Sequence, residues 1–305
     1  MQKTLAIVIP AYKSDYLERT LQSLAEQTDQ AFTVYIGDDA SPSDLRSIVM
    51  MFSDSLNLHY HRFETNLGKT DLVAHWQRCI NMCRGEEWIC LFSDDDIMER
   101  RCVEAFHQCS VPDSVNVLHF NIDIVDADGY LLQSCPPFPE QLTVNAFFNQ
   151  LFRRQIVARM PEFFFRNVSL QSTGIIPFDL AWRSDTATVM QNAAKGSILS
   201  ITGPETKVLW RSSHTNISGI DNLKGRKNVV NIDFFNWTYD FFERNPPLPM
   251  SRFFLLKTIV FSLEKTNNRE LLKDEWRAAT RLKAAKGVYF IVFLLLILYR
   301  ILYRE

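Results

Sequence analysis

A buried strand that runs directly into three carboxylates limits the folds open to this chain. Residues 88–92 form an uninterrupted apolar run, which is typical of a strand covered on both faces in a parallel sheet. Asp94, Asp95 and Asp96 follow almost at once. Because adjacent like charges repel, this strand end needs either a bound cation or a helix N-terminus that the carboxylates cap. A divalent cation such as Mg²⁺ or Mn²⁺ is favoured, since these ions bind carboxylate and phosphate oxygens.

The first third of the chain alternates between short apolar runs and amphipathic segments. Strands are expected over residues 5–9, 32–36, 58–62 and 88–92, and helices over residues 16–27, 43–52 and 71–83, with Ser43 as the cap of the second helix. This alternation predicts an α/β fold with a Rossmann-like, doubly wound, mostly parallel sheet. Polar loops follow each strand, and ligands of such sheets bind at the carboxyl ends of the strands.

The later part of the chain gives a coarser pattern. We expect a strand over residues 115–124, a turn over 126–129, a helix over 142–154, a buried segment over 163–165 and a strand over 207–211. Residues 226–283 are rich in aromatic side chains and are expected to form helices that pack into a core, with no charge pattern that indicates chemistry.

Composition excludes several classes of protein. The chain has 305 residues, of which 47% are hydrophobic and 22% charged, and its net charge of −2 gives no reason to expect nucleic acid binding. Six cysteines show no zinc-like spacing, so free thiols in a reducing cytosol are expected. No GxGxxG or GxxxxGK[ST] motif occurs, which disfavours dinucleotide and P-loop sites.

An ordered set of motifs resembles family 2 of the nucleotide-sugar glycosyltransferases. The set covers about the first 130 residues and consists of Ile7-Val8-Ile9-Pro10-Ala11-Tyr12, then Leu21, Ser23, Leu24 and Gln27, then Asp38-Asp39-Ala40-Ser41, Asn66-x-Gly68, Gly85 and Ser93-Asp94-Asp95-Asp96. The resemblance implies an A-type glycosyltransferase fold, in which a Rossmann-like nucleotide half is fused to an acceptor half. It also implies inversion at the transferred sugar.

The resemblance assigns roles to the residues at the strand ends. Asp39 is expected to hydrogen-bond the nucleobase, while Pro10, Ala11 and Tyr12 frame the base and ribose. Asp95 is expected to bind Mn²⁺ or Mg²⁺ on the diphosphate, with Asp94 beside it near the ribose or sugar. Lys69, in the loop over residues 66–69, is a further candidate for nucleotide binding. Ser93 stands where the family usually has an aspartate.

Residues 172–185 resemble the acceptor-side segment of the same family. There a glycine-containing loop, here with Gly174, precedes a helix that bears an acidic residue, here Asp185. Asp185 is therefore the expected catalytic base, and its alternative role is to stabilise the helix N-terminus. Asp179 is the second candidate for the base. Arg211 is a possible contact of the diphosphate, whereas His214 is more simply a surface residue.

These expectations combine into one functional hypothesis. The sequence predicts a glycosyltransferase domain over residues 1–215, with a nucleotide half over about 1–130 and an acceptor half over about 131–215, followed by a helical segment over 216–285. The resemblance implies as partners a nucleoside diphosphate sugar and a saccharide or lipid-linked acceptor with a free hydroxyl, and, together with the end of the sequence, a role in bacterial polysaccharide or lipid-linked oligosaccharide synthesis. The alternatives are a nucleotidyltransferase and a non-catalytic nucleotide-sugar-binding membrane protein.

The end of the sequence suggests membrane association. Residues 286–305 contain an apolar stretch over 287–303 that would measure about 25 Å as a helix, less than the roughly 30 Å of a bilayer core. Basic and tyrosine side chains flank it, as in interfacial segments. No signal peptide is expected. We therefore expect peripheral or monotopic attachment to the cytoplasmic face of the inner membrane, with a marginal single span or a core or dimer helix as alternatives.

Overall fold

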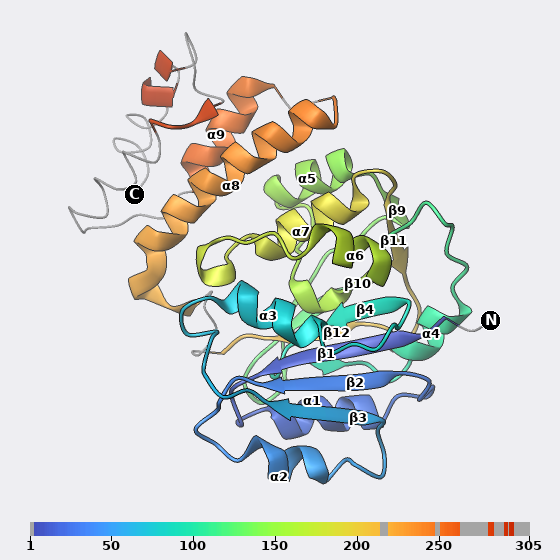
Figure 1. Cartoon of the computed structure of the whole chain (residues 1–305). Helices are drawn as coiled ribbons and strands as arrows, with labels where there is room; N and C mark the ends of the chain where they lie inside the picture. Colours follow the sequence, from blue (N-terminus) through green and yellow to red (C-terminus); the bar gives the residue numbers. More distant parts are fainter. Residues whose placement is uncertain are drawn as a thin grey trace.

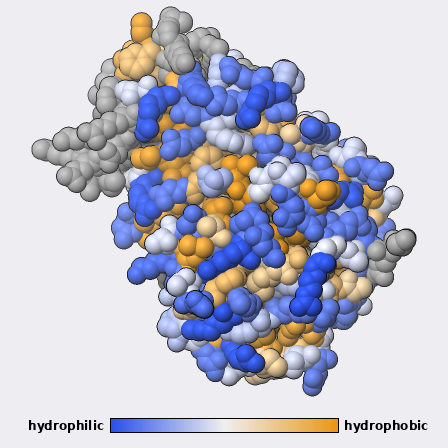
Figure 2. Space-filling view, in the orientation of Figure 1, coloured by the Kyte–Doolittle hydropathy of each residue, from blue (hydrophilic) through white to orange (hydrophobic). Residues whose placement is uncertain are grey.

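A computed structural model of the chain describes residues 3–213, 219–247, 251–262, 280–283, 290–291 and 293–295. Figure 1 shows a central sheet with helices on both faces, and the helices that follow residue 224 lie at one end of the molecule. Figure 2 shows polar residues over most of this face, with apolar residues gathered where α8 lies near α7.

The predicted parallel sheet is confirmed. Strands β1 (Leu5–Ala11), β2 (Thr33–Asp38), β3 (Leu58–Arg62) and β4 (Trp88–Leu91) pair in parallel in the order β3-β2-β1-β4. The helices between them are α1 (Leu17–Ala25), α2 (Leu45–Met50) and α3 (Leu72–Ile80). All four strands therefore end at the same edge, where the sequence places its polar loops.

Side chains of the central strands alternate between two apolar cores. Ala6 and Val8 of β1 face the core that contains α3, α7 and α8, whereas Leu5, Ile7 and Ile9 face the core that contains α1 and α2. Since successive residues of a strand point to opposite faces, an unbroken apolar run is what a sheet covered on both sides requires.

The large sheet continues with a reversed strand. Strand β10 (Phe163–Arg166) is antiparallel to β4 and to β6 (Val117–Phe120), between which it lies. Strands β11 (Ile198–Ile201) and β9 (Gln141–Leu142) complete an eight-stranded sheet within the described residues. A four-stranded sheet joins β5 (Ile97–Met98), β12 (Val208–Arg211), β7 (Ile122–Val125) and β8 (Leu131–Ser134).

The remaining described helices lie mostly after residue 140. They are α4 (Cys102–Gln108), α5 (Val144–Phe152), the 3-10 helix η1 (Met160–Glu162), α6 (Asn167–Thr173), the 3-10 helix η2 (Asp179–Ala181), α7 (Ser184–Ala193), the 3-10 helix η4 (Asp221–Leu223), α8 (Lys224–Arg244) and α9 (Arg252–Ser262). Aromatic side chains of α8, among them Phe234, Phe235 and Phe242, are buried, as the sequence predicts.

Several predicted boundaries are wrong. The single strand expected over residues 115–124 is two strands in different sheets, β6 and β7, separated at Asn121. Strand β1 continues through Pro10 to Ala11, which pairs with Asp38. Asp44, not Ser43, caps α2 by accepting a hydrogen bond from the amide of Ser47. The helix expected from residue 142 begins at Val144, because Leu142 belongs to β9.

Two further findings concern membranes and thiols. Within the described residues, no helix has both the length and the apolar character needed to cross a bilayer. The apolar stretch over residues 287–303 lies mostly outside the described residues. All six cysteines are free.

Gly196 is expected to be essential for the turn between α7 and β11. A methyl group at this position would lie 2.0 Å from the backbone oxygen of Ser114, and backbone cannot move aside as a flexible side chain can. Gly196→Ala should lower the free energy of unfolding by about 2–3 kcal/mol, as overpacking does. Gly219→Ala is the control, because its methyl group would meet the oxygen of Ser213 at an ordinary 3.5 Å. Equal denaturant midpoints for the two variants would contradict this account.

Candidate active site

One pocket collects residues from both halves of the chain at the carboxyl edge of the sheet. Its volume is about 750 Å³. The residues predicted from sequence that line it are Pro10, Tyr12, Asp39, Lys69, Asp94, Asp95 and Asp185. Ala11 does not line the pocket, because the alternation of β1 turns its side chain into the opposite core; its carbonyl oxygen instead accepts a hydrogen bond from the amide of Asp39 at 2.9 Å.

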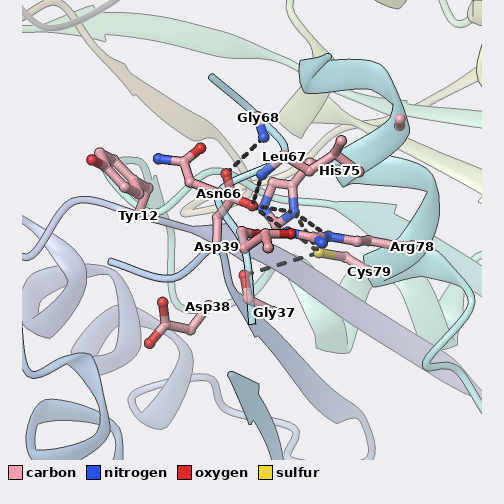
Figure 3. Close-up of polar contacts among 12 residues, drawn as sticks. Tyr12, Gly37, Asp38, Asp39, Asn66, Leu67, Gly68, His75, Arg78 and Cys79 are labelled. Atoms are coloured by element: carbon pink, nitrogen blue, oxygen red, sulfur yellow. Dashed lines mark hydrogen bonds and ion pairs between the residues drawn. The ribbon is translucent and has the colours of Figure 1, made fainter. Parts of the chain in front are cut away.

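Asp39 fixes the loop over residues 66–69. Its Oδ1 accepts a hydrogen bond from the amide of Leu67 at 2.9 Å, and its Oδ2 accepts one from the amide of Gly68 at 2.8 Å (Figure 3). The guanidinium of Arg78, on α3, also donates to Oδ1. A side chain at Gly68 would place its first carbon 2.7 Å from Oδ2, so this close approach requires glycine.

His75 is part of this cluster and was missed by sequence reasoning. It lines the pocket, and its Nδ1 accepts a hydrogen bond from Nε of Arg78 at 3.1 Å and lies 3.4 Å from Oδ1 of Asp39. Burial lowers the pKa of His75 to about 4, so the ring is neutral at pH 7. The spacing of His75 and Arg78, one helical turn apart after a strand-end loop, is the signal that could have identified the pair.

Asp38 has a different role from its neighbour Asp39. Its carboxylate is fully buried and points away from Asp39 in Figure 3. It accepts hydrogen bonds from the hydroxyl of Tyr60 at 2.6 Å, from Arg62 at 2.8 Å and from the amide of Ser41 at 2.8 Å. Burial of the Tyr60 hydroxyl, together with its hydrogen bond to Asp38, raises the pKa of Tyr60 to about 12. Asp38 therefore stabilises the strand ends and does not reach the pocket.

The three adjacent aspartates face three different environments. Asp94 Oδ2 accepts hydrogen bonds from the amides of Tyr12 and Lys13, both at 2.9 Å. Asp95 Oδ2 lies 2.5 Å from the ammonium of Lys13. Asp96 turns away from the pocket, and its Oδ1 accepts the amide of Arg211 at 2.8 Å. Burial raises the pKa of Asp96 well above its usual range.

The helix-cap interpretation of this triplet is wrong. Strand β5 follows it directly, and α4 begins only at Cys102. Arg211 is also not a pocket residue: it is fully buried, and its guanidinium donates to the backbone oxygens of Asp95, Asp126 and Ala127. Its contribution is to hold the loop that carries the aspartates. His214 lies outside the described residues.

Asp95 and Asp94 fit a divalent cation chemically. Their carboxylates line the pocket, and the ammonium of Lys13 already lies between them, 2.5 Å from Asp95 and 3.7 Å from Asp94. The described residues contain no group of three or more acidic, histidine or cysteine side chains arranged to hold a metal. The protein would thus supply one or two carboxylate ligands to the ion. This is usual for Mg²⁺ sites in which phosphate oxygens and water provide the remaining ligands.

The part of the pocket predicted to bind the acceptor is built on a strained turn before α7. Leu180, Ala181 and Arg183 all have left-handed backbone angles, with φ of 60°, 52° and 72°. Such conformations cost free energy in residues other than glycine and concentrate at functional sites. Asp185 follows in the first turn of α7 and lines the pocket, while its Oδ1 accepts the amide of Thr186 at 2.6 Å.

Helix α8 supports this turn, which sequence reasoning did not foresee. Buried Asn231 accepts hydrogen bonds through Oδ1 from Nε1 of Trp182 at 3.2 Å and from Nε of Arg183 at 2.9 Å. Asp179, the second candidate for the base, does not line the pocket and forms an exposed ion pair with Arg226 at 2.6 Å. Among the described residues after 130 that line the pocket, Asp185 is therefore the acidic one.

Comparisons with known proteins agree with this architecture. The structure resembles residues 1–349 of S. aureus TarS, solved with UDP-GlcNAc, with a TM-score of 0.60 and 16% identity, over 97% of this chain and 91% of that one. It also resembles the mannosyltransferase PcManGT from Pyrobaculum calidifontis, solved with GDP-Man and Mn²⁺, with a TM-score of 0.53 and 15% identity, over 100% and 88% of the two chains. At these identities the likeness shows the fold.

No curated protein sequence matches the chain. A family model described as glycosyl transferase family 2 matches residues 6–160, which include all of β1 to β4 except Leu5, together with Asp39 and the three aspartates. The chain therefore belongs to glycosyl transferase family 2 and is a glycosyltransferase.

Proposed function

We propose that the protein transfers a sugar from a nucleoside diphosphate sugar to a hydroxyl group of a saccharide or lipid-linked acceptor, with inversion at the transferred carbon. The observation that carries this proposal is that Asp39, Asp95 and Asp185 line one pocket, from β2, the end of β4 and the start of α7. The nucleotide sugars bound by TarS and PcManGT support the donor class.

The nucleotide half would bind the donor through its loops. Asp39 keeps acceptor capacity beyond the amides of Leu67 and Gly68 for an N–H of the base. Pro10 and Tyr12 line the same pocket and would contact the base and ribose. Lys69 also lines it and adds a positive charge for the phosphates. Arg78, which also donates to neutral His75, holds the Asp39 carboxylate in a fixed orientation, so binding costs little reorganisation.

Asp95, with Asp94 beside it, would hold Mn²⁺ or Mg²⁺ on the diphosphate. When bound, such an ion neutralises the negative charge that develops on the leaving diphosphate. Lys13 occupies the same carboxylates with its ammonium, so it would have to move away from Asp95. PcManGT, solved with Mn²⁺, supports this assignment by analogy of fold.

Asp185 would accept the proton of the acceptor hydroxyl. A hydroxyl is too weak an acid to attack quickly unaided, and a carboxylate on the side opposite the leaving group allows a single displacement. One oxygen of Asp185 is oriented by the amide of Thr186 at 2.6 Å. Trp182 lines the pocket beside it, held in place by Asn231. A single displacement inverts the configuration of the transferred carbon.

The two alternative functions, nucleotidyl transfer and non-catalytic binding, can be distinguished from glycosyl transfer by the products that are released. A nucleotidyltransferase would release pyrophosphate from a nucleoside triphosphate, and a non-catalytic binding protein would release nothing. Two incubations of the full chain separate the three: one with a panel of nucleotide sugars, followed by detection of free nucleoside diphosphate, and one with nucleoside triphosphates and sugar phosphates, followed by detection of pyrophosphate. We expect release of the diphosphate and place the reaction in bacterial cell-surface polysaccharide or lipid-linked oligosaccharide synthesis.

Asp95→Asn is expected to reduce transfer to below about 1% of that of the unaltered enzyme, because a neutral amide is a poor ligand for a hard cation. The same variant should lose the Mn²⁺-dependent part of nucleotide affinity, measured by calorimetry with and without the ion. Asp128→Asn is the matched control, since this aspartate lies exposed in the turn between β7 and β8. Full transfer by Asp95→Asn in the presence of a chelator would remove the metal from the mechanism.

Asp185→Asn is expected to lower transfer by about two to four orders of magnitude, the usual range for loss of a general base. Nucleotide affinity should stay near that of the unaltered protein, because the base contacts the acceptor. Asp179→Asn serves as control, since its ion pair with Arg226 lies outside the pocket lining. If Asp185→Asn loses donor affinity in proportion to activity, its role is to stabilise the helix and not to take a proton.

Residues 286–305 are proposed to attach the enzyme to the cytoplasmic face of the inner membrane. A chain that ends at residue 285 should remain in the supernatant after sedimentation with vesicles that contain anionic lipids, whereas the full chain should sediment. Both chains should bind nucleotide equally, which verifies that the shortened chain is folded. Continued sedimentation of the shortened chain would show that attachment lies elsewhere.

A further inference from the structure

Two arginines of the pocket have no carboxylate partner within the described part of the chain. Arg159 and Arg183 line the acceptor side, and neither forms an ion pair among those residues. Other arginines of the chain do pair with carboxylates, namely Arg62, Arg78, Arg101, Arg166 and Arg226. An arginine kept without a counter-ion in a pocket is a candidate binding group for an anion.

Arg183 is held in a defined position. Its Nε donates to Oδ1 of Asn231 at 2.9 Å, and its guanidinium carbon lies 5.3 Å from the ring centre of Phe152 and 5.5 Å from that of Trp182. Its backbone is in the left-handed region, with φ of 72°. Only Nε has an acceptor within the described structure, so the two terminal nitrogens can donate to a ligand.

Arg159 approaches the same pocket from the segment before β10. Its guanidinium lies over the ring of Trp210, 4.9 Å from the ring centre, and Nη1 donates to the backbone oxygen of Ala158 at 2.8 Å. Trp210 also lines the pocket. This stacking leaves the edge of the guanidinium available, which is the arrangement in which arginine binds planar oxyanions with two hydrogen bonds.

The charges around the two arginines do not cancel. Burial lowers the pKa of Arg183, Asp185 opposes this shift, and the positive charge of Arg159 adds to it. Glu162, the acidic residue nearest to Arg159 in the chain, forms no ion pair with it within the described residues, and burial raises the pKa of Glu162 well above its usual range. Two cations thus face the single carboxylate of Asp185, and a bound anion would relieve their repulsion.

We propose that Arg159 and Arg183 form a subsite for an oxyanion, a phosphate or carboxylate group carried by the acceptor. The assignment to the acceptor, which depends on the proposed function, follows from position: Arg183 lies two residues before Asp185, the proposed base, and both arginines come from the acceptor half. The donor phosphates, in contrast, are expected at Asp95 and Lys69. The acceptor is therefore an anionic saccharide or a phosphate-linked chain with its charged group near the attacked hydroxyl.

The test uses the full chain saturated with UDP or GDP, whichever binds, and Mn²⁺. Binding of glycerol 3-phosphate, glucuronate and glucose is measured by calorimetry at low ionic strength, for the unaltered protein, Arg159→Gln, Arg183→Gln and Arg183→Lys. Arg101→Gln is the control, since Arg101 pairs with Glu104 on α4, outside the pocket lining. Thermal unfolding midpoints verify that each variant is folded.

We expect one or both anions to bind in the presence of the nucleotide, and glucose to bind at least about tenfold more weakly. Each Arg→Gln variant should weaken anion binding by about tenfold or more with nucleotide affinity unchanged, and Arg183→Lys should retain part of it. The relative affinity of phosphate and carboxylate identifies the acceptor's charged group. Competition between anion and nucleotide, equal binding of glucose, or unchanged anion affinity in both Arg→Gln variants would overturn the subsite. Failure of the proposed function is seen separately, as absence of nucleotide binding in the first step.

Discussion

Three neighbouring carboxylates at the end of a buried strand cannot share one environment, and the site is arranged around the way their repulsion is resolved. Asp94 is directed to the amides of Tyr12 and Lys13, and so fixes the loop after β1. Asp96 is directed to Arg211 on β12, and so joins the two sheets. Asp95 lines the pocket with its Oδ2 beside the ammonium of Lys13, at 2.5 Å. The hydrogen bonds of Asp94 and Asp96 on either side thus hold the segment that carries Asp95 in place.

At the end of β2, too, one carboxylate has a structural role and its neighbour lines the pocket. Asp38 and Asp39 are adjacent, yet one is enclosed by Tyr60, Arg62 and the amide of Ser41, and the other faces the pocket. Because successive strand residues point to opposite faces, a pair of neighbouring acids at a strand end places one on each side. The segments that follow β2 and β4 thus each combine a rigid support with an accessible carboxylate.

Local patterns predicted the nucleotide half well because its elements are set by short-range periodicity. The apolar runs of β1 to β4 and the helical spacing of α1 to α3 are visible in the sequence, and so are Asp39 and Asp95 at the strand ends. The structure of residues 131–215, the predicted acceptor half, was harder to predict from local sequence patterns. Nothing local marks the change of sheet at Asn121, and the contacts of Asn231 with Trp182 and Arg183 join residues 48 and 49 positions apart. The roles of His75 and Arg159 could not be predicted locally, because they depend on Asp39 and Trp210, which are distant in sequence and are brought near them by the fold.

The reversed strand β10 has a consequence for how the acceptor half can change. Because β10 runs against its neighbours, the residues that enter it arrive at the rim where the parallel strands end, and Arg159 and η1 are thereby delivered to the pocket. The register of β10 is fixed on both sides, with Phe164 opposite Cys90 and Leu118. Insertions and deletions before the buried η1 would therefore reshape the rim without changing the register of β10, whereas any within β10 would shift its pairing with both neighbours. If this rim binds the acceptor, changes in acceptor recognition are accommodated in the segment before β10, because pairing with β4 and β6 fixes the register of β10 itself.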